Sequence, residues 1–420
     1  MIIRLSTCAT IGLALCAACH ERPPGNGAEL SHADSAGIFV VTLHDSLAAY
    51  PAVAATGSQR LRGAPVDLFR AGNPQMAVPL RDGRTLLSDG EIVAVFDSTG
   101  AYAGIAMPKG RGPGEVAALA NIWQTVDDSL WIADYATRRL SRVSPALRYL
   151  RGIDYPRSDE TGVLAVVGLL NGDTTAIVEF SPDPAGPPGL LEVRYRLGIW
   201  PMGGRPALGA PRKARELQRF ADGVLPPGVP GLDTPYDRAA QWVAYGRCML
   251  YGFPDRWELR IESADSSGRF ADVALLRAPN DVPPEIGRER KERFIRQAAS
   301  RLPERGPVTR AQLGRVMREH LIFPTRVPSF GRVMVSDDGA IWVQRFRESA
   351  EREPDRWTIV DARGMRSWRF ELPSGSQVLA VRPQGVLVAT RDADDVESQV
   401  WLRLPGLADV KLLPTCRLAS

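Results

Sequence analysis

The sequence predicts an all-β protein, a six-bladed β-propeller with a seventh blade left open as an alternative. A short phrase, a turn pair followed by an alternating apolar run, recurs about every 45 residues, the length of a propeller blade. Its copies begin at Asp82, Asp127, Asn171, Asp337 and Gln384. Second turns follow at residues 97–100, 265–268 and 361–364. Because one such unit cannot bury its own apolar face, the copies must stack around an axis.

Length and composition agree with one large β-domain. The chain has 420 residues, of which 44% are hydrophobic and 24% charged, as in ordinary globular proteins. Its net charge of +4 comes from 52 basic and 48 acidic residues, a balance too even for a nucleic-acid partner. We therefore expect a monomer that does not bind nucleic acid.

The N-terminus predicts export to the bacterial cell envelope. Residues 1–18 read as a signal peptide, because a basic start precedes an apolar run shorter than the roughly 20 residues that span a bilayer. Small residues then precede Cys19, which resembles the acylated cysteine of bacterial lipoproteins, although Cys16 stands where leucine is usual. We expect a lipid on Cys19, a tether over residues 19–36, and a protein facing the periplasm or the cell surface; plain secretion is the alternative.

Two cysteines remain beyond the leader and tether, Cys248 and Cys416. An exported protein can form disulfides, and a bridge here would join a middle segment to the last strand. Free cysteines also behave as small buried hydrophobes. We favour two separate buried thiols and keep the disulfide as the alternative.

The blades can be placed along the chain between residues 37 and 414, leaving 415–420 as a tail. A lone strand at 37–43 is expected to complete the last blade and so close the ring. The six units cover about 76–115, 121–155, 163–200, 241–278, 326–373 and 377–414. The Gly- and Pro-rich stretch 201–235 is expected to be a long loop, unless it hides a seventh blade.

A helical hairpin is predicted before the fifth blade, over residues 284–321. Ile295 and Ala299 fit one apolar helix face, and Leu313 and Met317 fit another. Thr309, followed three residues later by a glutamine, predicts a capping box at the start of the second helix. The many charges of this region are expected to lie on a solvated face.

The string Lys109-Gly-Arg-Gly-Pro-Gly-Glu115 lies between the first two units. This arrangement resembles the bacterial six-bladed β-propeller lipoproteins related to NHL-repeat proteins, which carry a Gly-Arg/Lys-Gly-Pro-Gly-Glu phrase between their first blades. The resemblance covers residues 37–414 and departs at Val116, where phenylalanine is usual. It implies the fold and leaves the activity open.

The Gly-rich loop supplies the candidate binding residues. They are Lys109, Arg111, Glu115, Asp134 and Arg138. We interpret the loop first as a structural connection between blades, because glycine and proline dictate its path. Contact with a ligand or partner is the second interpretation, since successive N–H groups in such turns can bind an anion.

Catalytic motifs are scarce. Four histidines cannot easily form a zinc or copper site, and no Gly-x-Ser-x-Gly elbow is present. Acidic residues at strand ends could bind Ca²⁺ in the central channel, or could simply cap turns. These residues are Asp89, Asp134, Asp173, Asp337, Asp338 and Asp392.

The leading hypothesis is an envelope-tethered binding or scaffolding module without catalysis or cofactor. Its partner would be an envelope protein or a small ligand, contacted through the Gly-rich loop, the stretch 201–235 or the helical hairpin. The alternative is a metal-dependent lactonase- or lyase-like hydrolase with Ca²⁺ or Zn²⁺ held by channel carboxylates.

Overall fold

The computed structural model describes most of the chain beyond the leader. The residues it describes are 28–29, 31–35, 38–43, 50–65, 68–69, 74–156, 163–183, 190–218, 236, 240–265, 270–279, 281–301, 309–349, 352–361, 366–391, 397–407, 410 and 416. Cys19 and Asp392, both singled out in the sequence, lie outside them. Within the described part, no helix has the length and apolar character needed to cross a membrane.

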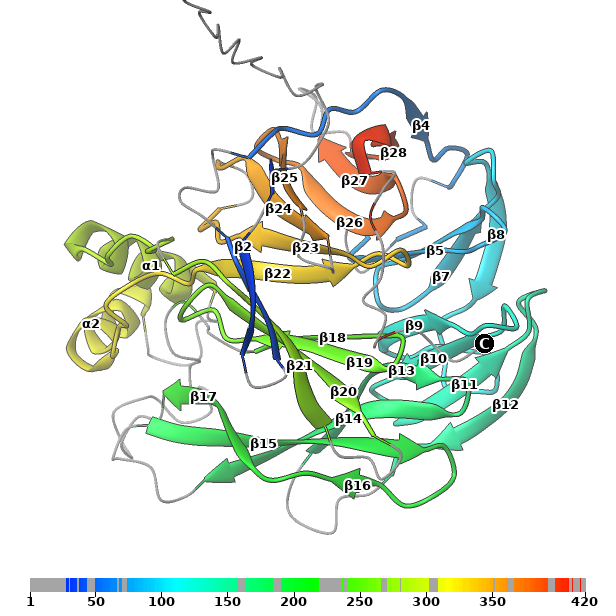
Figure 1. Cartoon of the computed structure of the whole chain (residues 1–420), viewed down its shortest axis with the longest axis horizontal. Coiled ribbons are helices and arrows are strands. Elements are labelled where there is room, and N and C mark those ends of the chain that lie inside the picture. Colours follow the sequence, from blue (N-terminus) through cyan, green and yellow to red (C-terminus); the bar gives the residue numbers. More distant parts are fainter. Residues whose placement is uncertain are drawn as a thin grey trace, which may run out of the picture.

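Six sheets, antiparallel except for the β21–β3 pair of blade 4, form the ring of a β-propeller, which confirms the predicted fold class (Figure 1). Blade 1 consists of β5 (Met76–Pro79), β6 (Thr85–Ser88), β7 (Val93–Phe96) and β8 (Tyr102–Met107). Blade 2 consists of β9 (Leu119–Gln124), β10 (Leu130–Asp134), β11 (Arg139–Val143) and β12 (Tyr149–Asp154). Blade 3 consists of β13 (Val163–Asn171), β14 (Thr174–Asp183), β15 (Leu190–Pro201), β16 (Ala207–Leu208) and β17 (Arg212–Gln218).

The other three blades include strands from the N-terminal segment. Blade 4 consists of β18 (Gln241–Tyr245), β19 (Cys248–Gly252), β20 (Glu258–Ala264), β21 (Phe270–Arg277), β3 (Ile38–Thr42) and β2 (Ser31–Ser35). Blade 5 consists of β22 (Phe330–Val335), β23 (Ala340–Arg345), β24 (Asp355–Asp361), β25 (Arg366–Leu372) and β1 (Ala28–Glu29). Blade 6 consists of β26 (Gln377–Arg382), β27 (Gly385–Arg391), β28 (Glu397–Arg403) and β4 (Ser58–Arg60), and a 3₁₀ turn, η2 (Pro405–Leu407), follows it.

The hydrophobic core is divided among the six interfaces between neighbouring blades. Successive side chains of a strand point to opposite faces of its blade and so to opposite neighbouring blades. In β6, Leu86 therefore packs toward blade 2 and Leu87 toward blade 6. In the same way, Trp131 packs toward blade 3 and Ile132 toward blade 1. Strands β6 and β10, each the second strand of its blade, are therefore buried on both faces, which explains their continuous apolar runs.

The strand that closes the ring is not the one predicted. Residues 38–42 do form a strand, β3, but it pairs in parallel with β21 of blade 4, and Val41 is buried between blades 4 and 5. Blade 6 is instead completed by β4, in antiparallel register with β28. The three residues of β4 are polar or charged, so they lack the apolar alternation that marks a strand in the sequence.

The stretch 201–235 is not simply a loop. Its strands β16 and β17 both pair with β15 and form the outer edge of blade 3. Residues 219–235 lie outside the described part of the chain. The ring has six blades, and the alternative of seven is wrong.

The predicted helical hairpin is present between blades 4 and 5. Helix α1 (Arg288–Arg301) and helix α2 (Arg310–His320) pack through Ile295, Ala299, Leu313 and Met317. The Thr309 hydroxyl accepts from the Gln312 N–H, and the Gln312 side-chain oxygen accepts from the Thr309 N–H, as the capping box requires. His320, at the end of α2, is exposed.

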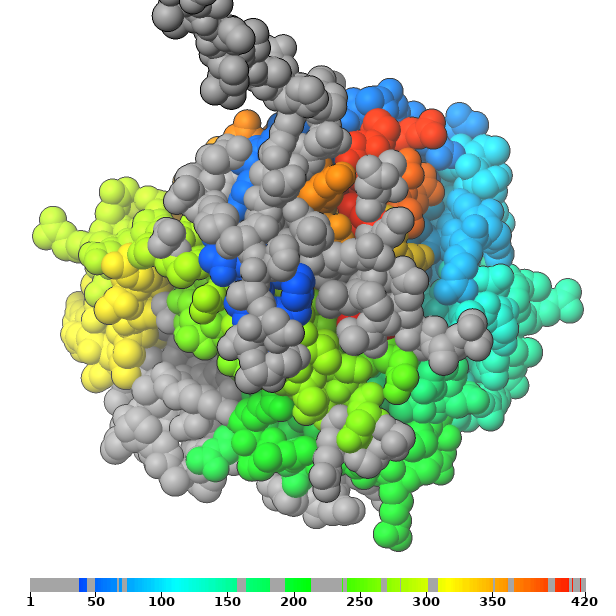
Figure 2. Space-filling view, in the orientation of Figure 1, coloured from blue at the N-terminus to red at the C-terminus, as the bar shows by residue number. Residues whose placement is uncertain are grey.

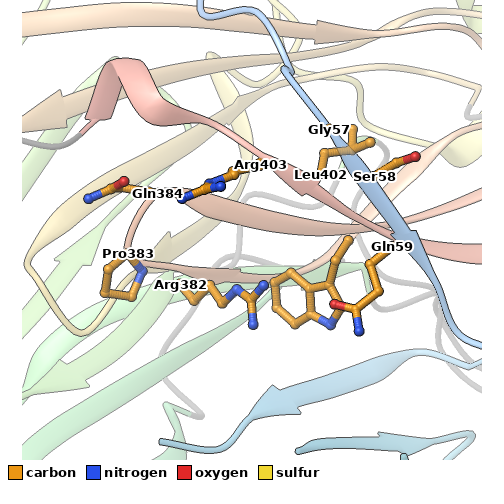
Figure 3. Close-up of a pocket in the computed structure, with 9 residues that line it drawn as sticks. Gly57, Ser58, Gln59, Arg382, Pro383, Gln384, Leu402 and Arg403 are labelled. Carbon is orange, nitrogen blue, oxygen red and sulfur yellow. The ribbon is translucent and has the colours of Figure 1, made fainter. Parts of the chain in front are cut away.

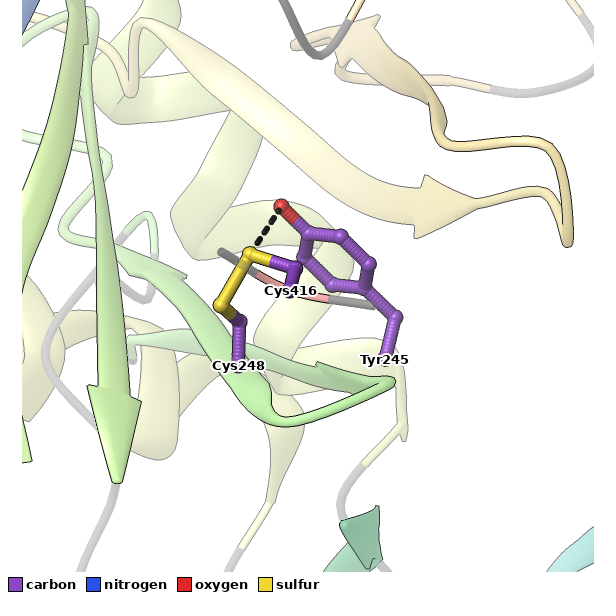
Figure 4. The surroundings of a disulfide bond; sticks show 3 residues. All are labelled: Tyr245, Cys248 and Cys416. Atoms are coloured by element: carbon purple, nitrogen blue, oxygen red, sulfur yellow. Dashed lines mark hydrogen bonds between the residues drawn. A yellow bond between two sulfur atoms is a disulfide. The ribbon is translucent and has the colours of Figure 1, made fainter. Parts of the chain in front are cut away.

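Cys248 and Cys416 are joined by a disulfide, so our preference for separate thiols was wrong (Figure 4). The Tyr245 hydroxyl donates to the sulfur of Cys416 at 3.6 Å, since a disulfide sulfur carries no hydrogen. Both cysteines are fully buried in the core between blades 4 and 5. The bridge therefore fixes the C-terminal segment to β19.

Replacing both cysteines by serine should lower the free energy of unfolding by about 2–5 kcal/mol, because the bridge closes a loop of 168 residues in the unfolded chain. Denaturant titration of wild-type and Cys248→Ser/Cys416→Ser proteins, each with and without reductant, measures this. Reductant should bring the wild type to the value of the variant. Equal stability under oxidising conditions would contradict the prediction.

Close packing of blades 3 and 4 depends on Gly168 in β13. A Cβ atom there would lie 2.2 Å from the Cβ of Ala244 in β18. Gly168→Ala should therefore lower the free energy of unfolding by about 1–3 kcal/mol through overpacking. Gly172→Ala is the matched control, because a Cβ at Gly172 meets nothing within 4 Å. Equal denaturation midpoints for the two variants would refute this account.

Candidate ligand-binding grooves

The Gly-rich loop folds around the carboxylate of its own Glu115. This carboxylate accepts a hydrogen bond from the N–H of Gly112 at 2.7 Å. A Cβ atom on Gly110 would lie 2.1 Å from the same carboxylate, which explains why glycine is needed there. The Arg139 guanidinium donates to the Gly112 carbonyl at 2.6 Å. A side chain of the protein thus already occupies the place where the loop would hold an anion.

The other predicted binding residues lie beside this loop. Asp134 is 2% exposed and accepts hydrogen bonds from the N–H groups of Ala117, Ala118 and Thr137. Lys109 forms an exposed ion pair with Glu91. Arg111 and Arg138 are exposed. Asp134 and Glu115 therefore stabilise the connection between blades 1 and 2, and a contact of Arg111 or Arg138 with a partner remains a prediction.

The strand-end acids do not converge in the described structure. Asp89 accepts hydrogen bonds from two N–H groups of its own turn, and Asp338 does so from Ala340. Asp173 is exposed and lies 3.7 Å from Arg151. Among the residues that the structure describes, no three His, Cys, Asp or Glu side chains gather as a metal site would require. Asp89, Asp134 and Asp338 therefore accept hydrogen bonds in turns, and the described residues offer no set of metal ligands for the hydrolase hypothesis.

A groove between the outer strands of blades 3 and 4 (the 3/4 groove) contains a buried polar network. Its cavity is about 370 Å³. Glu262 of β20 is 2% exposed and accepts two hydrogen bonds from Arg212 of β17, at 2.6 and 3.3 Å. The Tyr251 hydroxyl donates to the same carboxylate at 2.6 Å. The buried charge of Glu262 is thus fully compensated.

The remaining charges of the 3/4 groove are mostly paired as well. Arg260 binds Asp272 at 3.0 Å, and Arg256 binds Glu258 at 3.1 Å. Burial raises the pKa of Tyr195, which packs against Trp242 in this groove, to about 12. Burial also raises the pKa of Asp272, against the opposing effect of Arg260. Most charged side chains of the 3/4 groove are therefore in ion pairs, and the Arg212–Glu262 pair links blade 3 to blade 4.

A second hollow, which we call the blade-6 pocket, has a different charge balance (Figure 3). It has a volume of about 630 Å³. Its lining residues are Gly57, Ser58, Gln59, Arg382, Pro383, Gln384, Trp401, Leu402 and Arg403. It opens around the β26–β27 turn, where the end of β28 lies beside the start of the closing strand β4. Two arginines line it, and none of its described lining residues is acidic.

Arg382 is held in place within the blade-6 pocket by three features. Its guanidinium carbon lies 4.1 Å from the ring centroid of Trp401. The indole N–H of Trp401 donates to the Thr85 hydroxyl of blade 1 at 3.0 Å, which fixes the ring. A Cβ atom on Gly385 would lie 2.9 Å from Nε of Arg382, so glycine leaves room for the guanidinium.

Arg382 is a half-buried cation without an acidic partner in its pocket. Burial lowers the pKa of Arg382 because the charged form loses hydration. The Trp401 ring offsets part of this cost through a cation–π contact. The arginines of the 3/4 groove face carboxylates, whereas Arg382 lines a hollow that has no acidic residue among its described lining residues. The blade-6 pocket is therefore suited to an anion.

The sequence analysis missed Arg382 and Trp401 as site residues. Trp401 is 3% exposed and packs in the core between blades 6 and 1, so it looks like an ordinary core residue. The available signal was the turn at Gln384, preceded by Arg382 and followed by Gly385. The contact with Trp401 could not be read from this signal, because it depends on the pairing of β27 with β28.

No protein-family model matches this sequence, and no curated protein matches it either. Among solved structures, an exported protein from Bacteroides fragilis is similar, with 10% identity, a TM-score of 0.47, and coverage of 83% of this chain and 94% of that one. A DUF4221 family member from Bacteroides vulgatus has 8% identity, a TM-score of 0.45 and coverage of 84% and 97%. Regucalcin from Agrobacterium tumefaciens has 11% identity, a TM-score of 0.33 and coverage of 86% and 98%. Likenesses at this level assign no activity.

The raised pKa of Asp272 predicts a pH dependence of stability. A carboxyl whose pKa is higher in the folded than in the unfolded state binds its proton more tightly when folded. Its stabilising effect is present at low pH and is lost as the pH rises through the folded pKa. Asp272→Asn cannot titrate, so its stability relative to wild type should increase as the pH rises above about 4, the ordinary pKa of an aspartate carboxyl. Parallel stability curves, measured by denaturant titration, would contradict this.

Proposed function

We propose that this protein is a lipid-anchored binding propeller of the bacterial envelope that holds a small anionic ligand in the blade-6 pocket. The observation that carries the proposal is Arg382, a half-buried guanidinium stacked on Trp401 in a hollow with no acidic lining residue among those described. The leader, Cys19 and the Cys248–Cys416 disulfide support the proposed location in the envelope, since disulfides persist in oxidising compartments.

A bound anion would replace the interactions with water that the Arg382 guanidinium has lost through burial. The guanidinium presents a rigid fork of N–H donors, which matches the two oxygens of a carboxylate or phosphate. The Trp401 ring restricts its rotation, so less side-chain entropy is lost when the ligand binds. Arg403 adds a second positive charge to the same lining. The pocket therefore favours an anion with at least two oxygen acceptors.

Binding accounts for this pocket better than catalysis does. General acid–base chemistry usually requires His, Asp, Glu, Lys, Tyr or Cys, and none of these is among the described lining residues. Ser58 is the one hydroxyl there, and it is exposed without a base beside it in the lining. The side chains can orient and neutralise an anion but offer no route for proton transfer.

Calorimetric titration with inorganic phosphate and with citrate, at matched ionic strength, tests the proposal. At least one anion should bind saturably to the wild type, and Arg382→Gln should weaken that binding at least tenfold through the loss of the bidentate contact. Gly385→Ala should also weaken it, because the added Cβ displaces Arg382. Arg148→Gln, at an exposed site on blade 2, is the control and should bind like the wild type. Equal affinity in all four proteins would refute the site.

A further inference from the structure

The helical hairpin carries the positive charge of the molecule. Helices α1 and α2 contain nine basic and three acidic side chains, a net charge of +6. The whole chain has a net charge of +4, so everything outside the two helices sums to −2. Figure 2 shows the hairpin, in yellow and yellow-green, projecting from one side of the molecule. The hairpin is thus a cationic projection on an otherwise nearly neutral body.

Part of this charge is used to fix the hairpin to blade 5. Glu348, which follows β23, binds Arg290 at 3.1 Å and Arg293 at 2.8 Å. Arg318 of α2 binds Glu292 of α1 at 3.0 Å. With the apolar contacts between the helices, these pairs hold the hairpin in a defined orientation.

Three arginines remain exposed and without an acidic partner in the described structure: Arg288 and Arg296 on α1, and Arg315 on α2. The blade to which they are attached does not neutralise them. Three fixed cations on one projection attract a surface that carries many negative charges more strongly than they attract a single ion.

The N-terminal segment meets the same blade. Strand β1 pairs with β25 of blade 5, Ala28 opposite Ser367 and Glu29 opposite Arg366. The chain therefore enters β1 from the Leu372 end of β25, which is the end where the connections between blades lie. Cys19 precedes Ala28 by nine residues, which span at most about 32 Å. A lipid on Cys19 thus keeps the membrane close to blade 5.

We propose that the exposed arginines of the hairpin rest on anionic lipid headgroups, so that the protein contacts the membrane at two points. This inference rests on the proposed lipid anchor at Cys19. The short tether keeps the hairpin near the membrane surface, where basic side chains gain from the negative surface potential. Two weak attachments combined in this way hold a protein more firmly than either alone.

The test uses the acylated full-length mature protein in vesicles. Gln297→Cys, exposed on α1, introduces a free thiol for a fluorescent label, because Cys248 and Cys416 are bridged. Quenching by neutral acrylamide is compared in phosphatidylcholine vesicles with and without about 30% phosphatidylglycerol. Quenching should fall at least threefold in the anionic vesicles and recover in about 0.5 M NaCl, as expected for an electrostatic contact.

Charge reversal at Arg288, Arg296 and Arg315 to glutamate should abolish this protection. The matched control reverses three exposed arginines on blades 2, 3 and 4, namely Arg148, Arg205 and Arg247, and should keep it. If the protein floats with both kinds of vesicle but its label is quenched equally in them, the hairpin contact is refuted and the lipid anchor is not. Failure to float at all would overturn the anchor and the inference with it.

Discussion

The pairing of β4 with β28 is the interaction on which the rest of the structure depends. Each blade buries its faces only against its neighbours, so the ring is stable only when the last blade meets the first. Strand β4 completes blade 6, and Gln59 then donates to the Ser98 carbonyl of blade 1 at 2.8 Å. The same strand supplies one wall of the blade-6 pocket. The strand pairing that closes the ring therefore also builds one wall of the pocket.

The two hollows differ in which blades line them. The 3/4 groove lies between two neighbouring blades, whereas every described lining residue of the blade-6 pocket belongs to blade 6 or to the segment that leads into β4. In the 3/4 groove, Arg212 and Glu262 use this space to join the blades. In the blade-6 pocket, Arg382 is turned back onto Trp401 of its own blade and leaves the space open. The blade-6 pocket therefore suits a ligand better than the 3/4 groove, because its arginine has no acidic partner in the lining and its space is open.

The sequence predicted the features that depend on local chemistry. The recurring turn phrase located six blades, and Thr309 with its glutamine partner located the start of α2. The sequence did not predict features in which a segment pairs with a partner far away in the chain. Strand β4 carries no apolar pattern, and the Cys248–Cys416 bridge depends on residues 168 positions apart. The Gly-rich loop stands out in the sequence, but only the structure shows that Glu115 of the loop itself accepts a hydrogen bond from Gly112. Contact of Arg111 or Arg138 with a partner stays a prediction.

The proposed membrane contact and the proposed ligand site lie at opposite ends of the blade strands. The hairpin joins the end of β21 to the start of β22, at the strand ends where consecutive blades are connected. The blade-6 pocket surrounds the turn between β26 and β27, which lies at the opposite strand ends. A propeller that rests on its hairpin would therefore open its pocket away from the lipid. The N-terminal segment also pairs with blades 5 and 4, through β1 and β3, before the chain reaches β4. A pull on the anchor would therefore load those pairings before the strand that closes the ring.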